Sequence, residues 1–137
     1  MYREIETAII DKITGAIPDA PVLDTFGIVD FMEEGAPRVA VQVRWLGFAV
    51  DSQASNAANL QQRFEVAVLV DAARAMDDER AAAATGLLII VRSLLGFEIE
   101  RGRRLSLAGE TPAPDFDGMA MRLAVFFTVP GVVTAVR

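Results

Sequence analysis

Isoleucine recurs at every fourth position near the start of the chain, which is the spacing of one face of an α-helix. The residues in this stripe are Ile5, Ile9, Ile13 and Ile17. Glu4 and Glu6 lie in the first turn, where negative charge complements the helix dipole, and Pro18 ends the pattern. We therefore predict a helix over residues 2–17.

A second apolar stripe follows Asp77 and Asp78, two residues that can cap the free amides at a helix start. Its members are spaced by three and four positions and are Ala84, Leu87, Leu88, Val91, Leu94 and Leu95. They predict a long central helix from residue 77 to about residue 95, with Gly96 as its end signal. Gly86 costs such a helix about 1 kcal/mol relative to alanine, so we expect tight packing at this position.

Three segments alternate apolar and polar residues, which is the period of a strand with one buried face. They span residues 38–46, 62–71 and 119–129. The first two predict an antiparallel hairpin. Weaker patterns predict further strands, over residues 22–31, 97–99 and 104–107.

Two segments follow neither period. Residues 47–61 are polar and small, which predicts a long loop that is either functional or a plain hairpin connection. Residues 109–118 contain prolines and glycines that oppose regular structure. The order of elements predicts one α+β domain over residues 1–137, in which the N-terminal and central helices pack on a mixed, mainly antiparallel sheet.

Composition narrows the possible functions. The 137 residues are 53% hydrophobic, and they include 13 basic and 19 acidic side chains but no cysteine or histidine. These absences exclude disulfides, thiolate or imidazole zinc sites, and catalysis by Cys–His or Ser–His–Asp groups. The net charge of −6 disfavours nucleic-acid or acidic-membrane binding. The longest uncharged apolar run, residues 81–91, is too short to span a bilayer, so we expect no membrane partner.

The remaining polar clusters offer little chemistry. Arg101, Arg103 and Arg104 could hold a phosphate, but a solvated hairpin turn explains them better. Asp115 and Asp117 could bind a divalent cation through oxygen atoms, but capping and surface solubility explain all the acidic pairs of this chain. No phosphate-binding glycine loop occurs. We therefore expect no cofactor, no metal and no catalytic residues.

Apolar residues at outward positions of the predicted strands suggest contact between subunits. Phe126, Leu69 and the tail residues Val132 and Val133 suit such an interface. The alternative is a second layer within the same chain, because both faces of the sheet can be covered.

A fixed order of patterns extends over nearly the whole chain. The helix over residues 2–13 begins Tyr2-Arg3-Glu4-Ile5-Glu6, and a strand introduced by Pro37 follows. A strand over residues 63–70, a helix over residues 87–95 and a final strand over residues 121–128 complete the order. In these features the chain resembles the Mu-type phage and prophage tail-terminator family. Its general architecture is also similar to the tail terminators of long-tailed phages such as lambda and of gene-transfer particles.

The resemblance implies a structural role without catalysis. Family members form a ring, usually hexameric, on the head-proximal end of the tail tube, where they stop tube growth and meet the head-completion ring. The implied partners are further copies of the chain in a hexamer, the tail tube protein, a sheath protein and a head-completion or neck protein. DNA would pass through the lumen without specific binding, and like charge would keep it from adhering. The implied location is the virion tail or neck, with assembly in the cytoplasm of the bacterial host.

The residues expected at these interfaces lie in the 47–61 loop, in the turn at 100–104 and in the last strand. They are Asp51, Gln53, Asn56, Asn59, Gln61, Arg101, Arg103, Arg104 and Phe126. Two other classes of function stay open. One is a small-molecule-binding or regulatory module, and the other is an enzyme that uses carboxylates and arginine, with a divalent metal at Asp115 and Asp117.

Overall fold

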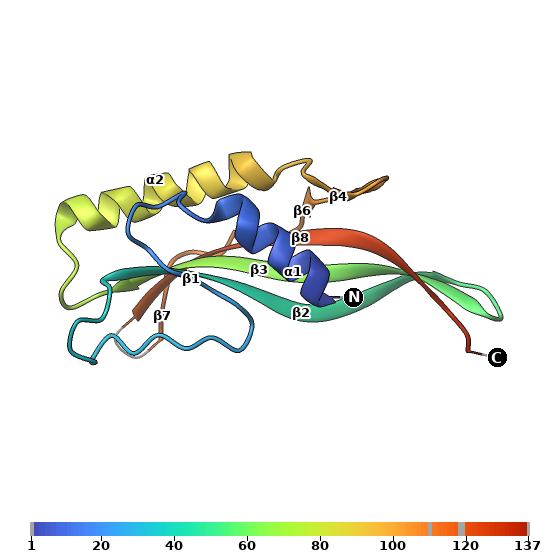
Figure 1. Cartoon of the computed structure of the whole chain (residues 1–137), viewed down its shortest axis with the longest axis horizontal. Helices are drawn as coiled ribbons and strands as arrows, with labels where there is room; N and C mark the ends of the chain where they lie inside the picture. Colours follow the sequence, from blue (N-terminus) through green and yellow to red (C-terminus); the bar gives the residue numbers. More distant parts are fainter. Residues whose placement is uncertain (1, 110, 118–119, 137) are drawn as a thin grey trace.

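Two helices lie over one face of a long, twisted sheet in the computed structural model of the chain (Figure 1). The structure describes residues 2–109, 111–117 and 120–136. The helices are α1 (Tyr2–Ile13) and α2 (Asp77–Leu94), and they contact each other as well as the sheet. Of the described residues, 23% are helical and 43% lie in strands, and the sheet is mixed but mostly antiparallel. The predicted α+β class is confirmed.

Three strands of 15 residues each form the centre of the sheet. They are β2 (Val39–Gln53), β3 (Ala57–Asp71) and β8 (Ala120–Thr134), and β3 lies between the other two. Shorter strands extend the order to β1-β2-β3-β8-β6, with β1 parallel to β2 and β7 paired to β8. A separate hairpin joins β4 and β5. The bounds of the short strands are β1 (Val22–Leu23), β4 (Glu98–Glu100), β5 (Arg103–Arg104), β6 (Ser106–Leu107) and β7 (Asp115–Asp117).

The main core lies between the helices and the sheet. All three alternating segments place their apolar side chains in this core. The largest fully buried side chains are Phe64 and Phe127 on neighbouring strands. The isoleucine stripe of α1 is buried in the same cluster, as are Ile90 and Leu94 of α2. Burial of these side chains stabilises the fold by about 25 cal/mol for each Å² of apolar surface removed from water.

Both helices differ in detail from their prediction. The first ends at Ile13, because Gly15 takes a left-handed conformation with φ of 87°. Ile17 therefore lies beyond the helix, although it is still buried. The second has the predicted length, but its buried face is shifted from the predicted one. Of the predicted stripe, Leu94 is buried and Leu87 and Val91 pack against the core. Leu88 and Leu95 are 65% and 57% exposed, whereas the buried residues are Ala83, Gly86, Ile90 and Leu94.

The shift has a physical cause in the composition of α2. Residues 81–91 are apolar or small on every side of the helix, so periodicity alone does not choose the face that is buried. The contact between Gly86 and Ile17 determines which face of α2 is buried. A Cβ atom added at Gly86 would lie 2.2 Å from Cγ1 of Ile17, so only glycine permits this close approach. The expectation of tight packing at Gly86 is confirmed.

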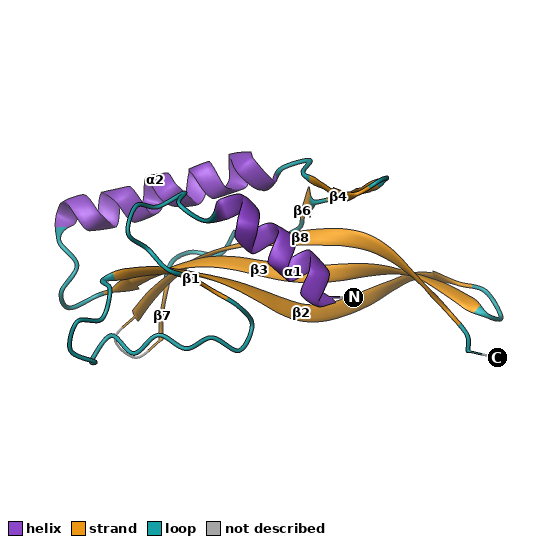
Figure 2. Ribbon diagram, in the orientation of Figure 1, coloured by secondary structure: helices purple, strands orange, loops and turns teal. Residues whose placement is uncertain are grey.

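A second layer covers the opposite face of the sheet. Residues 24–37 cross that face as an irregular segment, below the strands in Figure 2. The strand predicted over residues 22–31 is therefore wrong except for Val22 and Leu23. The amide of Gln42 holds the segment by donating to the backbone oxygens of Asp24 and Gly27. Phe31, Ala40, Ala67, Leu69 and Ala124 form a small second core beneath it. Leu69 is thus buried within the chain, and its predicted place at a subunit interface is wrong.

Two predicted loops contain strands instead. Residues 47–53 continue β2 and residues 57–61 begin β3, so only residues 54–56 connect the two strands. Residues 115–117 form β7, although prolines precede them. Neighbouring strands offer backbone partners that override the weak local preference in both places. Met119, the first residue of the last predicted strand, lies outside the described residues.

Asp71 ties the end of β3 to the second layer. Its Oδ1 accepts hydrogen bonds from the backbone N–H groups of Ala73 and Arg74, and its Oδ2 accepts one from Nε of Arg74 at 2.5 Å. The same guanidinium donates to the backbone oxygen of Phe31. Burial alone would raise the pKa of Asp71, but the bonds from Arg74 and Ala73 outweigh it and lower that pKa.

We predict that Gly86→Ala lowers the free energy of unfolding by about 1–3 kcal/mol, the usual cost of overpacking, although alanine is the better helix former. Urea denaturation measures the change. The same substitution in an Ile17→Ala background is expected to be neutral or stabilising, because the clashing atoms are gone. A Gly86→Ala protein more stable than the natural chain would contradict the packing described for this contact.

We predict that the lowered pKa of Asp71 makes stability fall in acid. The carboxylate stabilises the fold above its unfolded pKa of about 3.9, and this contribution is lost as the pH falls through the lower folded value. Urea denaturation between pH 6 and pH 3 should show Asp71→Asn less stable than the natural chain at pH 6. The difference should shrink toward pH 3, and a constant difference would contradict this role of the carboxylate.

Candidate functional site

The three central strands extend beyond the helices as an arm. We define the arm as residues 47–62 of β2 and β3 together with residues 129–136 at the end of β8. It projects from the helical part of the molecule (Figures 1 and 2). The predicted 47–61 loop is therefore the two-stranded part of a projecting sheet.

Trp45 marks the point where the arm leaves the body. Its ring stacks on that of Tyr2 at the start of α1, with ring centres 4.6 Å apart. Its Nε1 donates to Oε1 of Gln62 at 2.8 Å, and its backbone N–H donates to Oγ1 of Thr25 at 3.0 Å. These contacts join the helix, the sheet and the second layer at the base of the arm, so the arm starts from a fixed position.

Charge is almost absent from the arm. Asp51 is the one charged residue among its 24 positions, whereas the other 113 positions carry 31 of the 32 acidic and basic side chains. Exposed surfaces usually carry charged side chains of both signs, whereas depletion of charge is typical of the core of protein interfaces. The arm therefore has the composition of a contact surface.

The two faces of the arm carry different side chains. Strand register places Phe48 and Val50 on the same face as Leu60 and Val133, since directly paired residues share a face. Phe48, Val50 and Val133 are exposed there, whereas Leu60 is buried. The opposite face carries polar side chains that bond to each other. Nδ2 of Asn59 donates to Oγ of Ser52 at 2.8 Å, and Nε2 of Gln61 donates to Oδ2 of Asp51 at 2.9 Å.

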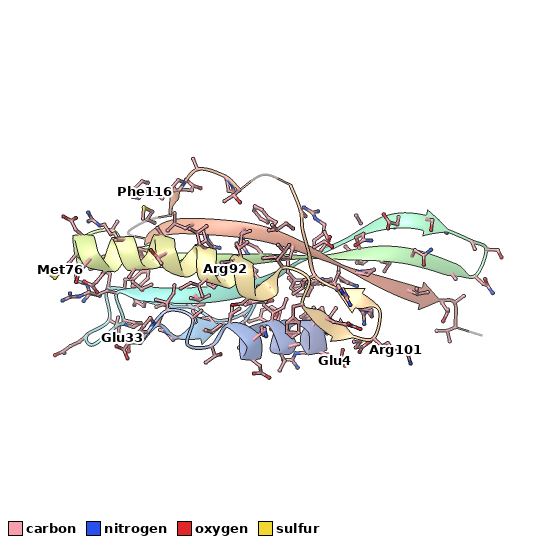
Figure 3. The ribbon with its side chains drawn as sticks, turned by 90° about the horizontal axis from the view of Figure 1, so that it is seen from above. Glu4, Glu33, Met76, Arg92, Arg101 and Phe116 are labelled. Atoms are coloured by element: carbon pink, nitrogen blue, oxygen red, sulfur yellow. The ribbon has the colours of Figure 1, made fainter. Side chains whose placement is uncertain are left out.

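A groove of about 500 Å³ separates the arm from the turn between β4 and β5. The groove is lined by Asp51, Ser52, Asn59, Leu60, Gln61, Gly102, Arg103, Pro130, Gly131 and Val132. Figure 3 shows Arg101 at that turn, near the base of the arm, with Met76 and Glu33 at the other end of the molecule. Within this lining Asp51 bonds to Gln61, Ser52 bonds to Asn59, and Arg103 bonds to the backbone of Pro130, so these contacts hold the groove in shape.

Arg103 fixes the turn against the arm. Its Nε donates to the backbone oxygen of Pro130 at 2.8 Å, and its Nη1 pairs with Glu100 at 3.0 Å. The other terminal nitrogen is buried without a hydrogen-bond partner among the described residues. Arg104 pairs with Glu98 at 3.2 Å on the solvent side. Arg103 and Arg104 are thus each paired with a carboxylate of the same hairpin, which agrees with the hairpin-turn explanation for these two arginines.

The structure brings four of the nine predicted interface residues together. Asp51, Asn59, Gln61 and Arg103 line the groove. Gln53 ends β2 and Asn56 lies in the tip of the arm, while Arg101 and Arg104 lie on the outer side of the β4–β5 hairpin. Phe126 is half-buried and packs against the second core, on the other face of β8 from Phe127.

Two exposed apolar residues were missed by sequence reasoning. Phe48 and Val50 are 53% and 58% exposed on the arm. Their alternation with Ala49 and Asp51 is a weak strand signal, and it was hidden by the small polar residues that follow. The tail residues Val132 and Val133, which were predicted to suit an interface, are also exposed on the arm.

Other kinds of site find little support in the described part of the chain. No group of three carboxylates that could hold a metal occurs there. Asp115 is exposed in β7, and the side chain of Asp117 lies outside the described residues. None of the described helices combines the length and apolar character needed to cross a bilayer.

Comparison with known proteins gives a likeness in fold. No protein-family model and no curated protein matches the chain. Among solved structures, it is similar to a chain in the "Virion of native gene transfer agent (GTA) particle". The TM-score is 0.57, the sequences are 16% identical, and the match covers 92% of each chain. At this identity the likeness shows a shared fold, over almost the full length of both chains.

We predict that Arg103→Ala lowers the free energy of unfolding by about 1 kcal/mol, because it removes the hydrogen bond that joins the turn to β8. Arg104→Ala is the matched control. It removes an exposed ion pair of the same hairpin and should change stability by less than about 0.5 kcal/mol. Equal losses in urea denaturation would contradict the special role of Arg103.

Proposed function

We propose that the chain is a structural subunit of a phage-like particle, and that it caps the head-proximal end of a tail tube. The observation that carries this proposal is the arm, a rigidly based projection of the sheet that has almost no charge. Such a surface suits contact with other proteins, and four of its polar side chains bond to one another in two pairs.

The fold likeness supports the same class of function. The similar chain belongs to the virion of a gene transfer agent particle, and the two chains match over 92% of their lengths. Fold alone does not determine function. The arm adds an argument from this chain itself, because it is the part of the fold that is built for contact.

In this proposal, copies of the chain form a ring, for which a hexamer is the expected size. The ring stops tube growth and meets tube, sheath and head-completion proteins. The net charge of −6 suits a ring through which DNA passes without adhering, because like charges repel. The chain would act by surface complementarity, without catalysis, in the virion tail or neck after assembly in the host cytoplasm.

We predict that a shortened arm folds but does not cap tails. Replacing residues 51–59 with Asn-Gly joins Val50 and Leu60, which are paired strand residues, through a preferred hairpin turn. Negative-stain images of particles from the encoding cell should then show tails of irregular length without heads. A Leu88→Ser/Leu95→Ser variant, altered on the exposed side of α2, is the control and should cap normally. Normal tails joined to heads with the shortened arm would overturn the proposal.

A further inference from the structure

The outer edge of β2 is covered only as far as Trp45. The backbone N–H of Val41 donates to the oxygen of Pro21, and that of Trp45 donates to Oγ1 of Thr25. β1 pairs with β2 at Val41 and Gln42 alone. Beyond Trp45, no strand of the described chain pairs with this side of β2. An open strand edge is a template for another strand, and this one lacks the lysine or proline that usually protects it.

The outer edge of β8 is open over its last residues. β6 pairs with β8 at Phe127 and Thr128, and Nε of Arg103 donates to the backbone oxygen of Pro130. The carbonyls of Phe126 and Pro130 both accept bonds from the side away from β3, from Ala108 and Arg103. Because alternate residues of a strand point the same way, the N–H and C=O of Val132 point outward as well. Past Pro130, no strand of the described chain pairs with this edge.

We propose that residues 48–53 of β2 pair with residues 131–134 of β8 from a second copy, so that copies join head to tail through one continuous sheet. The inference rests on the proposed function, since it says how subunits of the ring would be joined. β2 and β8 are both antiparallel to β3 and so run in the same direction. Copies related by a rotation would therefore pair them as parallel strands, as β1 and β2 already pair within the chain.

Side chains at the two edges fit this arrangement. Phe48 and Val50 at the β2 edge and Val133 at the β8 edge share one face and are 53%, 58% and 44% exposed. Neighbouring strands lie about 4.8 Å apart, so pairing brings these apolar side chains into contact. One charge, that of Asp51, would lie at each junction.

A two-fold pairing of β2 with β2 fits less well. It would bring the Asp51 carboxylates of two copies toward each other, and like charges across paired strands are destabilising. It would also leave Val133 exposed. Head-to-tail contact uses both edges of every copy, and such contacts close into rings when the rotation between copies allows it.

Engineered disulfides test the pairing directly, because the chain has no cysteine of its own. Purified, concentrated Val50→Cys/Val133→Cys protein should give, on oxidation, a ladder of covalent oligomers that a reductant dissolves. Val50→Cys/Leu88→Cys is the matched control, since Leu88 is exposed on α2 and belongs to neither strand edge, and it should give no ladder. Adding Val132→Pro, which removes one outward N–H, should reduce the ladder about fivefold.

Three results would overturn the proposal. They are the absence of a ladder, an equal ladder in the control, and covalent dimers from Val50→Cys alone, which would indicate two-fold pairing. None of these results would decide whether the chain caps tails, because subunits could form a ring through other surfaces. Conversely, tails capped normally by the shortened-arm protein would overturn the proposed function even if the ladder formed.

Discussion

The length of the three central strands is the constraint on which the rest of the structure depends. Fifteen residues of strand extend about 50 Å, whereas the 18 residues of α2 extend about 27 Å and the 12 of α1 less. The helices can therefore cover only part of the sheet, and the remainder must project. Trp45 lies at the boundary, where it contacts the helix, the neighbouring strand and the second layer at once. The arm follows from this mismatch between the lengths of the two layers.

Covered and projecting parts of the sheet have different chemistry. In the body both faces are buried, one under the helices and one under residues 24–37, and Gln42 and Arg74 bond the irregular layer in place. In the arm the backbone edges are partly open and charge is almost absent. A projection with open strand edges and almost no charge promotes association between molecules, which is a disadvantage for a protein that acts as a monomer. The same features are an advantage for a protein that functions by assembling with other subunits.

Sequence patterns predicted the parts of the fold that local physics decides. The isoleucine stripe of α1 and the alternation of Val41, Val43 and Trp45 each bury one side of an element, so their period is visible. Elements decided by tertiary contacts were less predictable. The face of α2 depends on Ile17 meeting Gly86, and the arm strands depend on pairing between small polar residues with no period of their own. For the candidate site, four of the groove's polar residues were predicted but its shape was not. Its shape depends on the bond from Arg103 to Pro130, which joins β5 and β8, two strands distant in sequence.

Electron cryomicroscopy of particles from the cell that encodes the chain tests the central claim most directly. The account predicts density for this fold in a ring at the head-proximal end of the tail tube, with the arm of each copy against its neighbour. Particles that lack the chain, or a ring in which the arms are free in solvent and the helices make the contacts, would contradict it.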